Sequence, residues 1–230
     1  MPGPSPSLTV AQIVDAAVRV ADEGGLDALS MRKVGSELGV AAMALYRYVR
    51  TKDELIDAMI DRVLGDDPAE GPVVCGWQAA LADEAARLRH AALSHPWVVG
   101  LLLGRPSFGL NFLRHVERAM ASVDGLGLTI DHMVDLTDTV RAFTVGFVQA
   151  ELAEVEAQRR TGQTEAEWRQ SVSPIVRAVL ATGEFPYVER IVIEAEDFPD
   201  SEITFQRRLG YILDGLAASV RTTVKRSAGT

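Results

Sequence analysis

Hydrophobic residues recur at helical spacing through most of the chain, whereas the alternation of apolar and polar residues that marks a strand is almost absent. The pattern therefore predicts an all-α fold. The first helix should begin after Thr9, because Thr9 and Gln12 have the spacing of a capping box, and it should end at Gly24-Gly25.

Three shorter helical segments are expected next. The first covers about residues 30–38, with Ser30 as its N-cap, and a glycine-containing turn separates it from a second helix of about residues 42–49. Thr51 and Glu54 form another capping box, which opens a third helix. Two helices joined by a short turn with glycine are the helix-turn-helix pattern.

The chain divides into two parts at residues 66–76, where two prolines and two glycines interrupt the periodic segments and predict a hinge. Residues 1–65 are then an N-terminal domain built around a three-helix helix-turn-helix unit, and residues 77–230 are a larger helical domain. Its expected helices lie near residues 77–94, 97–103, 107–123, 129–160, 164–181 and 201–224, and the stretch 183–199 is expected to be a loop with one short helix.

Composition excludes several classes of protein. A single cysteine, Cys75, excludes a disulfide scaffold and a cysteine-rich metal site. The first residues lack a signal peptide, and no apolar run approaches the roughly 18 residues of a membrane span, so we expect a cytoplasmic protein without membrane contact. The four histidines have no metal-ligand spacing, and phosphate loops and catalytic triads are missing, so no metal, cofactor or enzymatic activity is expected.

Charge is unevenly distributed along the chain. The net charge is −9, but the window 30–52 holds five cations against one acid, Glu37, for a local charge of +4. A basic window on a helix-turn-helix inside an acidic protein is what a sequence-specific DNA reader needs. On charge alone, a solvated helix face remains an equal alternative.

The segment 42–49 favours the DNA-reading alternative. Leu45 and Val49 are spaced to point inward, which leaves the opposite face of the helix for contacts outside. Met43 and Ala44 are suited to thymine methyl groups, and Tyr46 to a phosphate or a base edge.

Residues 8–64, with LSMRKVGSELGVAAMALYRYVRTKDELIDAM at their centre, resemble the DNA-binding domain of the tetracycline-repressor (TetR) family of bacterial regulators. Beyond the hinge, Trp77-Gln78, Gly104-Arg105-Pro106 and Phe143-Thr144-Val145-Gly146 resemble the ligand-binding domain of the tetracycline repressors themselves. The resemblance implies double-stranded DNA contacts from Ser30, Arg32, Lys33, Ala42, Met43, Ala44, Tyr46, Arg47 and Lys52. Arg32 is the expected guanine reader, while Arg47 and Lys52 are placed for phosphate.

The resemblance also implies a homodimer, in which residues 129–160 and 201–224 of each copy form a four-helix bundle. A small-molecule effector would release such a dimer from a palindromic operator. An activator or a corepressor-dependent regulator would have the same DNA-binding domain, so both remain alternatives. A helical small-molecule-binding protein without specific DNA binding is the alternative from another class.

The chain departs from the tetracycline repressors where they hold a magnesium-bound drug. The segment 100–104 has no histidine, and positions that align with another drug-side histidine and glutamate are Ala142 and Ala150, so we expect a largely apolar effector instead. The expected pocket residues are Leu88, Leu102, Phe108, Phe112, Met133, Thr137, Arg141 and Phe147. For most of them a place in the core is the alternative, and Arg141 would either anchor an anionic group or pair with Asp138.

Overall fold

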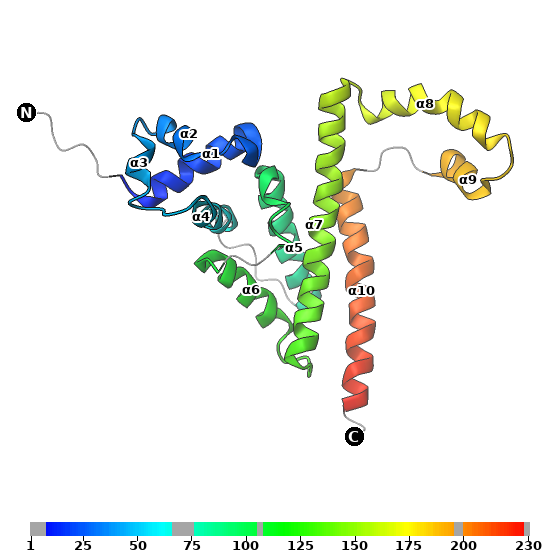
Figure 1. Ribbon diagram of the computed structural model, residues 1–230. Helices are drawn as coiled ribbons and strands as arrows, with labels where there is room; N and C mark the ends of the chain where they lie inside the picture. Colours follow the sequence, from blue (N-terminus) through cyan, green and yellow to red (C-terminus); the bar gives the residue numbers. More distant parts are fainter. Residues whose placement is uncertain (1–7, 66–75, 105–107, 196–199, 228–230) are drawn as a thin grey trace, which may run out of the picture.

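The computed structural model describes residues 8–65, 76–104, 108–195 and 200–227, and every regular element in these ranges is a helix (Figure 1). The all-α prediction is confirmed. The elements are α1 (Val10–Ala28), α2 (Met31–Glu37), α3 (Ala42–Leu45), α4 (Lys52–Leu64), α5 (Trp77–Ser94), η1 (Pro96–Val98), α6 (Leu110–Val123), α7 (Ile130–Thr161), α8 (Glu165–Leu180), α9 (Pro186–Glu194) and α10 (Ser201–Ser227).

The start of α1 is fixed by the expected capping box. Thr9 Oγ1 accepts a hydrogen bond from the amide of Gln12 at 3.2 Å, and the Gln12 side chain accepts one from the amide of Thr9 at 2.9 Å. Its end differs from the prediction. The helix is broken where expected, at Gly25 with φ of 72°, but a further turn carries it to Ala28.

Two predicted helices are shorter than expected. The segment 42–49 is helical only to Leu45, after which the amides of Tyr48 and Val49 both bond to the carbonyl of Leu45. The segment 97–103 is the short 3₁₀ helix η1 followed by turns, because Pro96 opens it and glycines at 100 and 104 give the chain little helical propensity. The predicted inward residues Leu45 and Val49 are both buried.

The body of the molecule is built on α7 and α10, which lie side by side and run in opposite directions (Figure 1). Phe143 and Phe147 of α7 pack against Phe205 of α10, with ring centroids 5.8 and 5.3 Å apart. Arg89 of α5 ties the pair together, because its guanidinium bonds to Glu151 of α7 at 2.6 Å and also to Glu202 of α10.

The four N-terminal helices, which we call the head, share their hydrophobic core with the body. Trp97 and Val98 of η1 and Val145 of α7 belong to the same buried cluster as the interior of α1 and α4. A polar contact crosses the same boundary, since Asp22 of α1 accepts hydrogen bonds from Trp97 Nε1 at 2.7 Å and from His95 Nδ1 at 2.9 Å. The head is therefore docked on the body.

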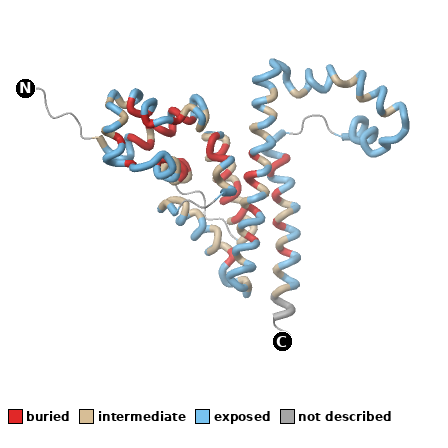
Figure 2. The backbone as a smooth tube through the Cα atoms, in the orientation of Figure 1, coloured by how far each residue is buried: buried red, intermediate tan, exposed pale blue. Residues whose placement is uncertain are grey.

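Helices α8 and α9 form an arm that stands away from the body (Figure 1). Figure 2 shows that the arm has exposed and half-buried residues but no buried ones, and it carries exposed large hydrophobic side chains. These are Trp168, Ile175, Val179, Phe185, Tyr187, Val188, Ile191, Val192 and Ile193.

Candidate nucleic-acid interface and ligand pocket

The turn between α2 and α3 brings the two helices unusually close. Gly39 adopts φ of 68°, a conformation that favours glycine, and the amide of Val40 bonds to the carbonyl of Gly35 at 2.8 Å. A Cβ atom on Gly35 would stand 2.7 Å from the carbonyl oxygen of Val40, so a larger residue would push the helices apart. This geometry is that of a helix-turn-helix.

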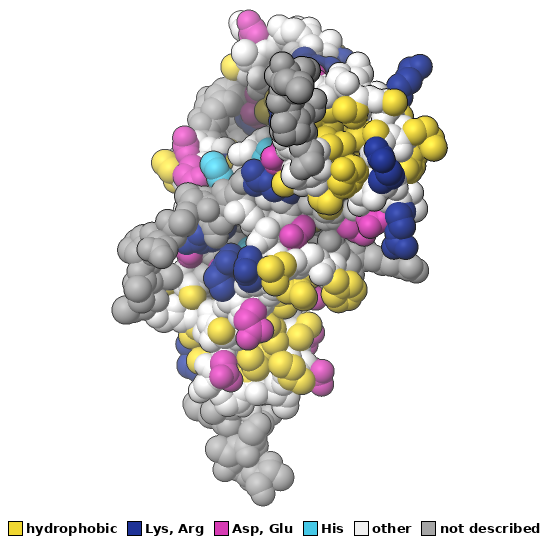
Figure 3. All heavy atoms as spheres, turned by 90° about the vertical axis from the view of Figure 1, so that its left-hand side faces the viewer, with side chains coloured by type: hydrophobic (Ala, Val, Ile, Leu, Met, Phe, Trp, Pro, Cys, Tyr) yellow, Lys and Arg dark blue, Asp and Glu magenta, His cyan; other side chains and the backbone are white. Residues whose placement is uncertain are grey.

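Most of the side chains predicted to contact DNA are exposed on the head. Met43 has 76% of its surface exposed and Tyr46 has 43%. Also exposed are Ser30, Arg32, Lys33, Arg47 and Lys52, while Ala42 and Ala44 are half-buried. Figure 3 views the molecule from the side of the head and shows lysine and arginine side chains standing beside exposed hydrophobic ones.

Some cations of this surface are paired with an acid and others are not. Arg32, Lys33, Arg47 and Lys52 form no ion pair with any carboxylate in the described part of the chain. Two acids nearby are already engaged, since Glu37 pairs with Arg19 at 3.2 Å and Glu54 with Arg50 at 3.5 Å. Four exposed cations therefore remain available for phosphate or base contacts.

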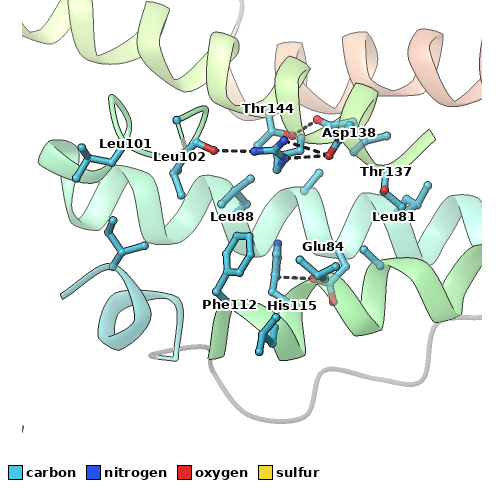
Figure 4. A pocket seen from close by; sticks show the side chains of 18 of the residues that line it. Leu81, Glu84, Leu88, Leu101, Leu102, Phe112, His115, Thr137, Asp138 and Thr144 are labelled. Carbon is cyan, nitrogen blue, oxygen red and sulfur yellow. Dashed lines mark hydrogen bonds and ion pairs between the residues drawn. The ribbon is translucent and has the colours of Figure 1, made fainter. Parts of the chain in front are cut away.

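A cavity of about 460 Å³ lies in the body between α5, α6 and α7 (Figure 4). Six of the eight predicted pocket residues line it: Leu88, Leu102, Phe108, Phe112, Thr137 and Arg141. Met133 and Phe147 do not, because they pack against the core around Phe205. A cavity of this size with mainly apolar walls suits a drug-sized molecule.

Arg141 is committed to groups of the protein. Its guanidinium bonds to Asp138 Oδ1 at 3.1 and 3.3 Å, and Nη1 donates to the carbonyl of Leu102 at 2.7 Å. Of the two sequence alternatives for Arg141, the structure shows the pair with Asp138. The guanidinium also holds the loop after η1 against α7.

A second charged group in the wall, formed by Glu84 and His115, was missed by sequence reasoning. Glu84 of α5 faces His115 Nδ1 of α6 at 2.7 Å, and Arg118 Nε donates to the other Glu84 oxygen at 2.7 Å. Burial opposes ionisation of Glu84, but the hydrogen bonds from His115 and Arg118 outweigh it and lower the pKa of Glu84. Glu84 and His115 lie on different helices, so no local spacing in the sequence points to the pair.

The pocket wall is joined directly to the head through α4 and α6. Asp61 of α4 caps α6, because its Oδ1 accepts hydrogen bonds from the amides of Asn111 at 2.7 Å and Phe112 at 3.0 Å. This cap explains why α6 begins at Leu110 rather than at the predicted residue 107.

Two glycines allow this close contact. A Cβ on Gly109 would stand 2.2 Å from Asp61 Oδ1, and one on Gly65 would stand 2.3 Å from Asn111 Nδ2. The neighbouring Ile60 of α4 itself lines the cavity. A change in the pocket therefore has a short path to the head.

Other expectations concern parts of the chain that are described only in part. Except for Gly76, the predicted hinge at 66–76, with Cys75, lies outside the described residues, as do Arg105 and Pro106. Within the described ranges, no group of three or more histidine, cysteine or acidic residues is arranged to hold a metal ion. No described helix is both long and apolar enough to cross a membrane.

Comparison with known proteins agrees with this arrangement. HTH-type transcriptional repressor DrrR1 of Streptomyces coeruleorubidus is 37% identical over 223 residues, which are 95% of this chain and 80% of that protein. An HTH-type transcriptional regulator of Saccharopolyspora erythraea is 32% identical over 93% of this chain and 86% of its own length. The crystal structure of the Streptomyces coelicolor TetR family protein ActR in complex with actinorhodin has a TM-score of 0.77 at 25% identity, covering 94% of this chain and 98% of that one.

Two family models match the two parts of the chain. The model for bacterial regulatory proteins of the tetR family matches residues 13–59. The model for the tetracyclin repressor-like C-terminal domain matches residues 68–220, which is more than half of the chain. The protein therefore belongs to the tetR family of bacterial regulatory proteins.

Proposed function

We propose that this protein is a transcriptional repressor that binds a palindromic operator as a homodimer and is released by a small-molecule effector bound in the cavity. The observation that carries the proposal is the head, where four exposed cations that have no carboxylate partner among the described residues lie on or beside a helix-turn-helix. Relatives that carry the names of repressors, and a structural neighbour that holds a small molecule, support both halves of it.

The contacts with DNA follow from the chemistry of the exposed side chains. Arg32 is proposed to read a guanine, because a guanidinium can donate two hydrogen bonds to the major-groove edge of that base. Met43 is proposed to contact a thymine methyl group, while Arg47 and Lys52 hold phosphates. Tyr46 adds a hydroxyl that donates to a phosphate or base edge.

Exposed apolar side chains support the homodimer. Val155 of α7 and Ile203 and Tyr211 of α10 are each more than 60% exposed on the surfaces that the family resemblance assigns to the four-helix bundle. The exposed hydrophobic residues of the arm add to this surface. A second copy would cover them, and it would place two heads roughly 34–36 Å apart, the spacing of successive major grooves.

The contact between α4 and α6 supports release by an effector. Asp61 binds the first amides of α6, and Phe112 in the same turn lines the cavity. A ligand that displaces Phe112 therefore moves the helix end to which the head is attached. Such a ligand releases DNA only to the extent that it binds the DNA-free state more tightly.

The test is selection of operator sequences from a randomised duplex pool by the full-length protein at about 150 mM salt, where unspecific attraction to phosphate is weakened. We expect an inverted repeat. Tyr46→Ala and Lys52→Ala should lose affinity for the selected duplex. Arg114→Ala, which removes an exposed arginine of α6 outside the head and outside the helices assigned to the dimer, is the matched control and should bind normally.

Two results would contradict the proposal. Recovery of no enriched sequence by a folded protein would favour the alternative of a helical small-molecule-binding protein. Unchanged operator affinity in both Tyr46→Ala and Lys52→Ala would contradict the assignment of the reading surface.

A further inference from the structure

The cavity offers acceptors of hydrogen bonds, and this limits the chemistry of what can occupy it. His115 lies on α6 with only 15% of its side chain exposed, and it lines the cavity beside Phe112. In Figure 4 the side chains of Phe112 and His115 rise together from α6 into the space bounded by α5 and α7. One nitrogen of this imidazole faces Glu84, so the other determines what the ring offers to a ligand.

The hydrogen bond with Glu84 fixes the tautomer of His115. Glu84 is held ionised, and an ionised carboxylate only accepts hydrogen bonds, so Nδ1 carries the proton and donates it. The charge of Glu84 is already balanced by Arg118, whose Nη2 lies 3.4 Å from the same Nδ1. In a neutral imidazole that carries its proton on Nδ1, the lone pair is on Nε2.

Nε2 of His115 has no hydrogen-bond partner among the described residues. The ring is oriented by Glu84 through Nδ1, so Nε2 is a positioned acceptor in the wall of a mostly apolar cavity. A lone pair that accepts no hydrogen bond from the protein favours a ligand group that can donate to it.

The wall formed by α7 also offers hydrogen-bond acceptors to a ligand. The hydroxyl hydrogens of Thr137 and Thr144 are used by carbonyls of α7, at 3.1 and 2.8 Å, so only the oxygen lone pairs remain for a ligand. Asp138 likewise presents carboxylate oxygens, while the guanidinium of Arg141 is taken up by Asp138 and the carbonyl of Leu102. The described walls thus have acceptors to offer and no free cation.

We infer that the ligand of this cavity is an uncharged, largely apolar molecule with a hydroxyl group that donates a hydrogen bond to Nε2 of His115, and that Glu84 is the residue that positions the imidazole. The inference rests on the proposed effector role of the cavity. It excludes anionic ligands held by Arg141. It also assigns specificity to two residues that have no role in DNA binding.

The experiment uses three matched tricyclic probes that differ in one substituent: 2-(hydroxymethyl)anthraquinone, 2-methylanthraquinone and anthraquinone-2-carboxylate. Dissociation constants are measured for the full-length protein without DNA, by calorimetry or fluorescence. We expect the hydroxymethyl probe to bind roughly fivefold to tenfold more tightly than the methyl probe, the range of one hydrogen bond. The carboxylate should bind most weakly.

Variants at His115 then test whether this residue accepts the hydrogen bond from the hydroxyl group of the probe. In His115→Phe the preference for hydroxymethyl over methyl should disappear, while the methyl probe still binds. His115→Gln, whose amide oxygen can accept, should recover part of the preference. Glu84→Gln should reduce the same ratio, because an amide no longer fixes the tautomer; a purely structural role would weaken all three probes equally.

Three outcomes would overturn the inference. These are tightest binding of the carboxylate probe, an unchanged preference in His115→Phe, and failure of all three probes to bind at their solubility limits. Operator affinity, measured separately on the selected duplex, reports on the repressor function alone. Operator binding without binding of any probe would overturn the inference and leave the proposed repressor function intact. Probe binding with the expected preference but without operator binding would support the inference and contradict the repressor function.

Discussion

The head and the cavity use charge in opposite ways. On the head, Arg32, Lys33, Arg47 and Lys52 are exposed and have no carboxylate partner among the described residues. Around the cavity, charged side chains balance one another within the protein, as in the pair of Asp138 with Arg141 and the cluster of Glu84, His115 and Arg118. Unpaired charge suits a polyanion in water, whereas balanced charge in a partly buried wall suits a neutral guest.

The strongest way to break this comparison is to place an acid among the free cations. Met43→Glu adds a carboxylate on the exposed face of α3, and we expect operator binding to weaken by several kcal/mol, because each half-site then sets a carboxylate against DNA. The measurement is fluorescence anisotropy with the selected duplex.

Met43→Gln is the matched control, since it has nearly the same size without the charge. It should lose far less affinity than Met43→Glu. Equal losses in the two variants would show that shape rather than charge governs this surface.

The link between the two regions is tested next by Asp61→Ala. The change removes the carboxylate that caps α6, and the loss of such a cap costs about 0.5–2 kcal/mol of stability. Urea denaturation measures this loss. We also expect a ligand that occupies the cavity to release DNA less completely, because α6 is then tied to α4 less firmly, with the bond from Asn111 Nδ2 to the carbonyl of residue 61 still in place.

A variant Asp61→Asn keeps an acceptor oxygen and should recover much of the stability. If effector-induced release were complete in Asp61→Ala, the route through α4 and α6 would be contradicted.

The balanced charges of the body predict a loss of stability in acid. Burial opposes ionisation of Glu84 and Glu151, but hydrogen bonds from His115 and Arg118 to the first, and from Arg89 and Ser201 to the second, lower both pKa values below the usual 4.5. A pKa lowered by folding stabilises the folded state above the unfolded value, and this contribution disappears as the pH falls through the lowered pKa.

We therefore expect the free energy of unfolding to fall as the pH drops below about 4.5, and to fall less steeply in Glu84→Gln and Glu151→Gln. Denaturant titrations between pH 3 and 7 measure both slopes. Identical slopes in wild type and the two variants would show that these carboxylates do not control the acid response.

The smallest effect is expected from Glu37→Gln. Glu37 is the one acid in the window 30–52, and its exposed pair with Arg19 contributes about 0–1 kcal/mol. Removing it frees Arg19 and makes the head more positive, so affinity for random duplex should rise by less than about fivefold. Filter binding with a non-operator duplex measures the change, and a decrease would contradict the role given to the free cations.

Local signals in the sequence predicted the helices well. Thr9 opens α1 in the expected capping box, and Thr51 caps α4, although Glu54 bonds to the amide of Arg50 instead of completing the box. Leu45 and Val49 are buried at the spacing that placed them inward. Errors arose where tertiary contacts decide the boundary. The start of α6 depends on Asp61 of another helix, which no pattern near residue 110 records.

The candidate pocket was predicted less completely, for a related reason. Thr137 and Arg141 lie one helical turn apart and both line the cavity. Met133, one turn before Thr137, and Phe147, beyond Arg141, instead pack against the buried cluster that contains Phe205. Glu84 and His115 meet only because α5 and α6 pack together. Such pairs across helices leave no spacing for sequence reasoning to find.

Gly65 and Gly109, which let α4 and α6 meet, have a consequence for how such a regulator can evolve. A lineage that acquires a new operator can vary the residues at 42–44, and one that acquires a new inducer can vary the cavity walls. Neither lineage can replace these glycines by larger residues, because a side chain at residue 65 would displace Asn111 and one at residue 109 would displace Asp61. In a genetic screen for regulators that no longer respond, we expect single substitutions at these two codons to be recovered although neither glycine touches DNA.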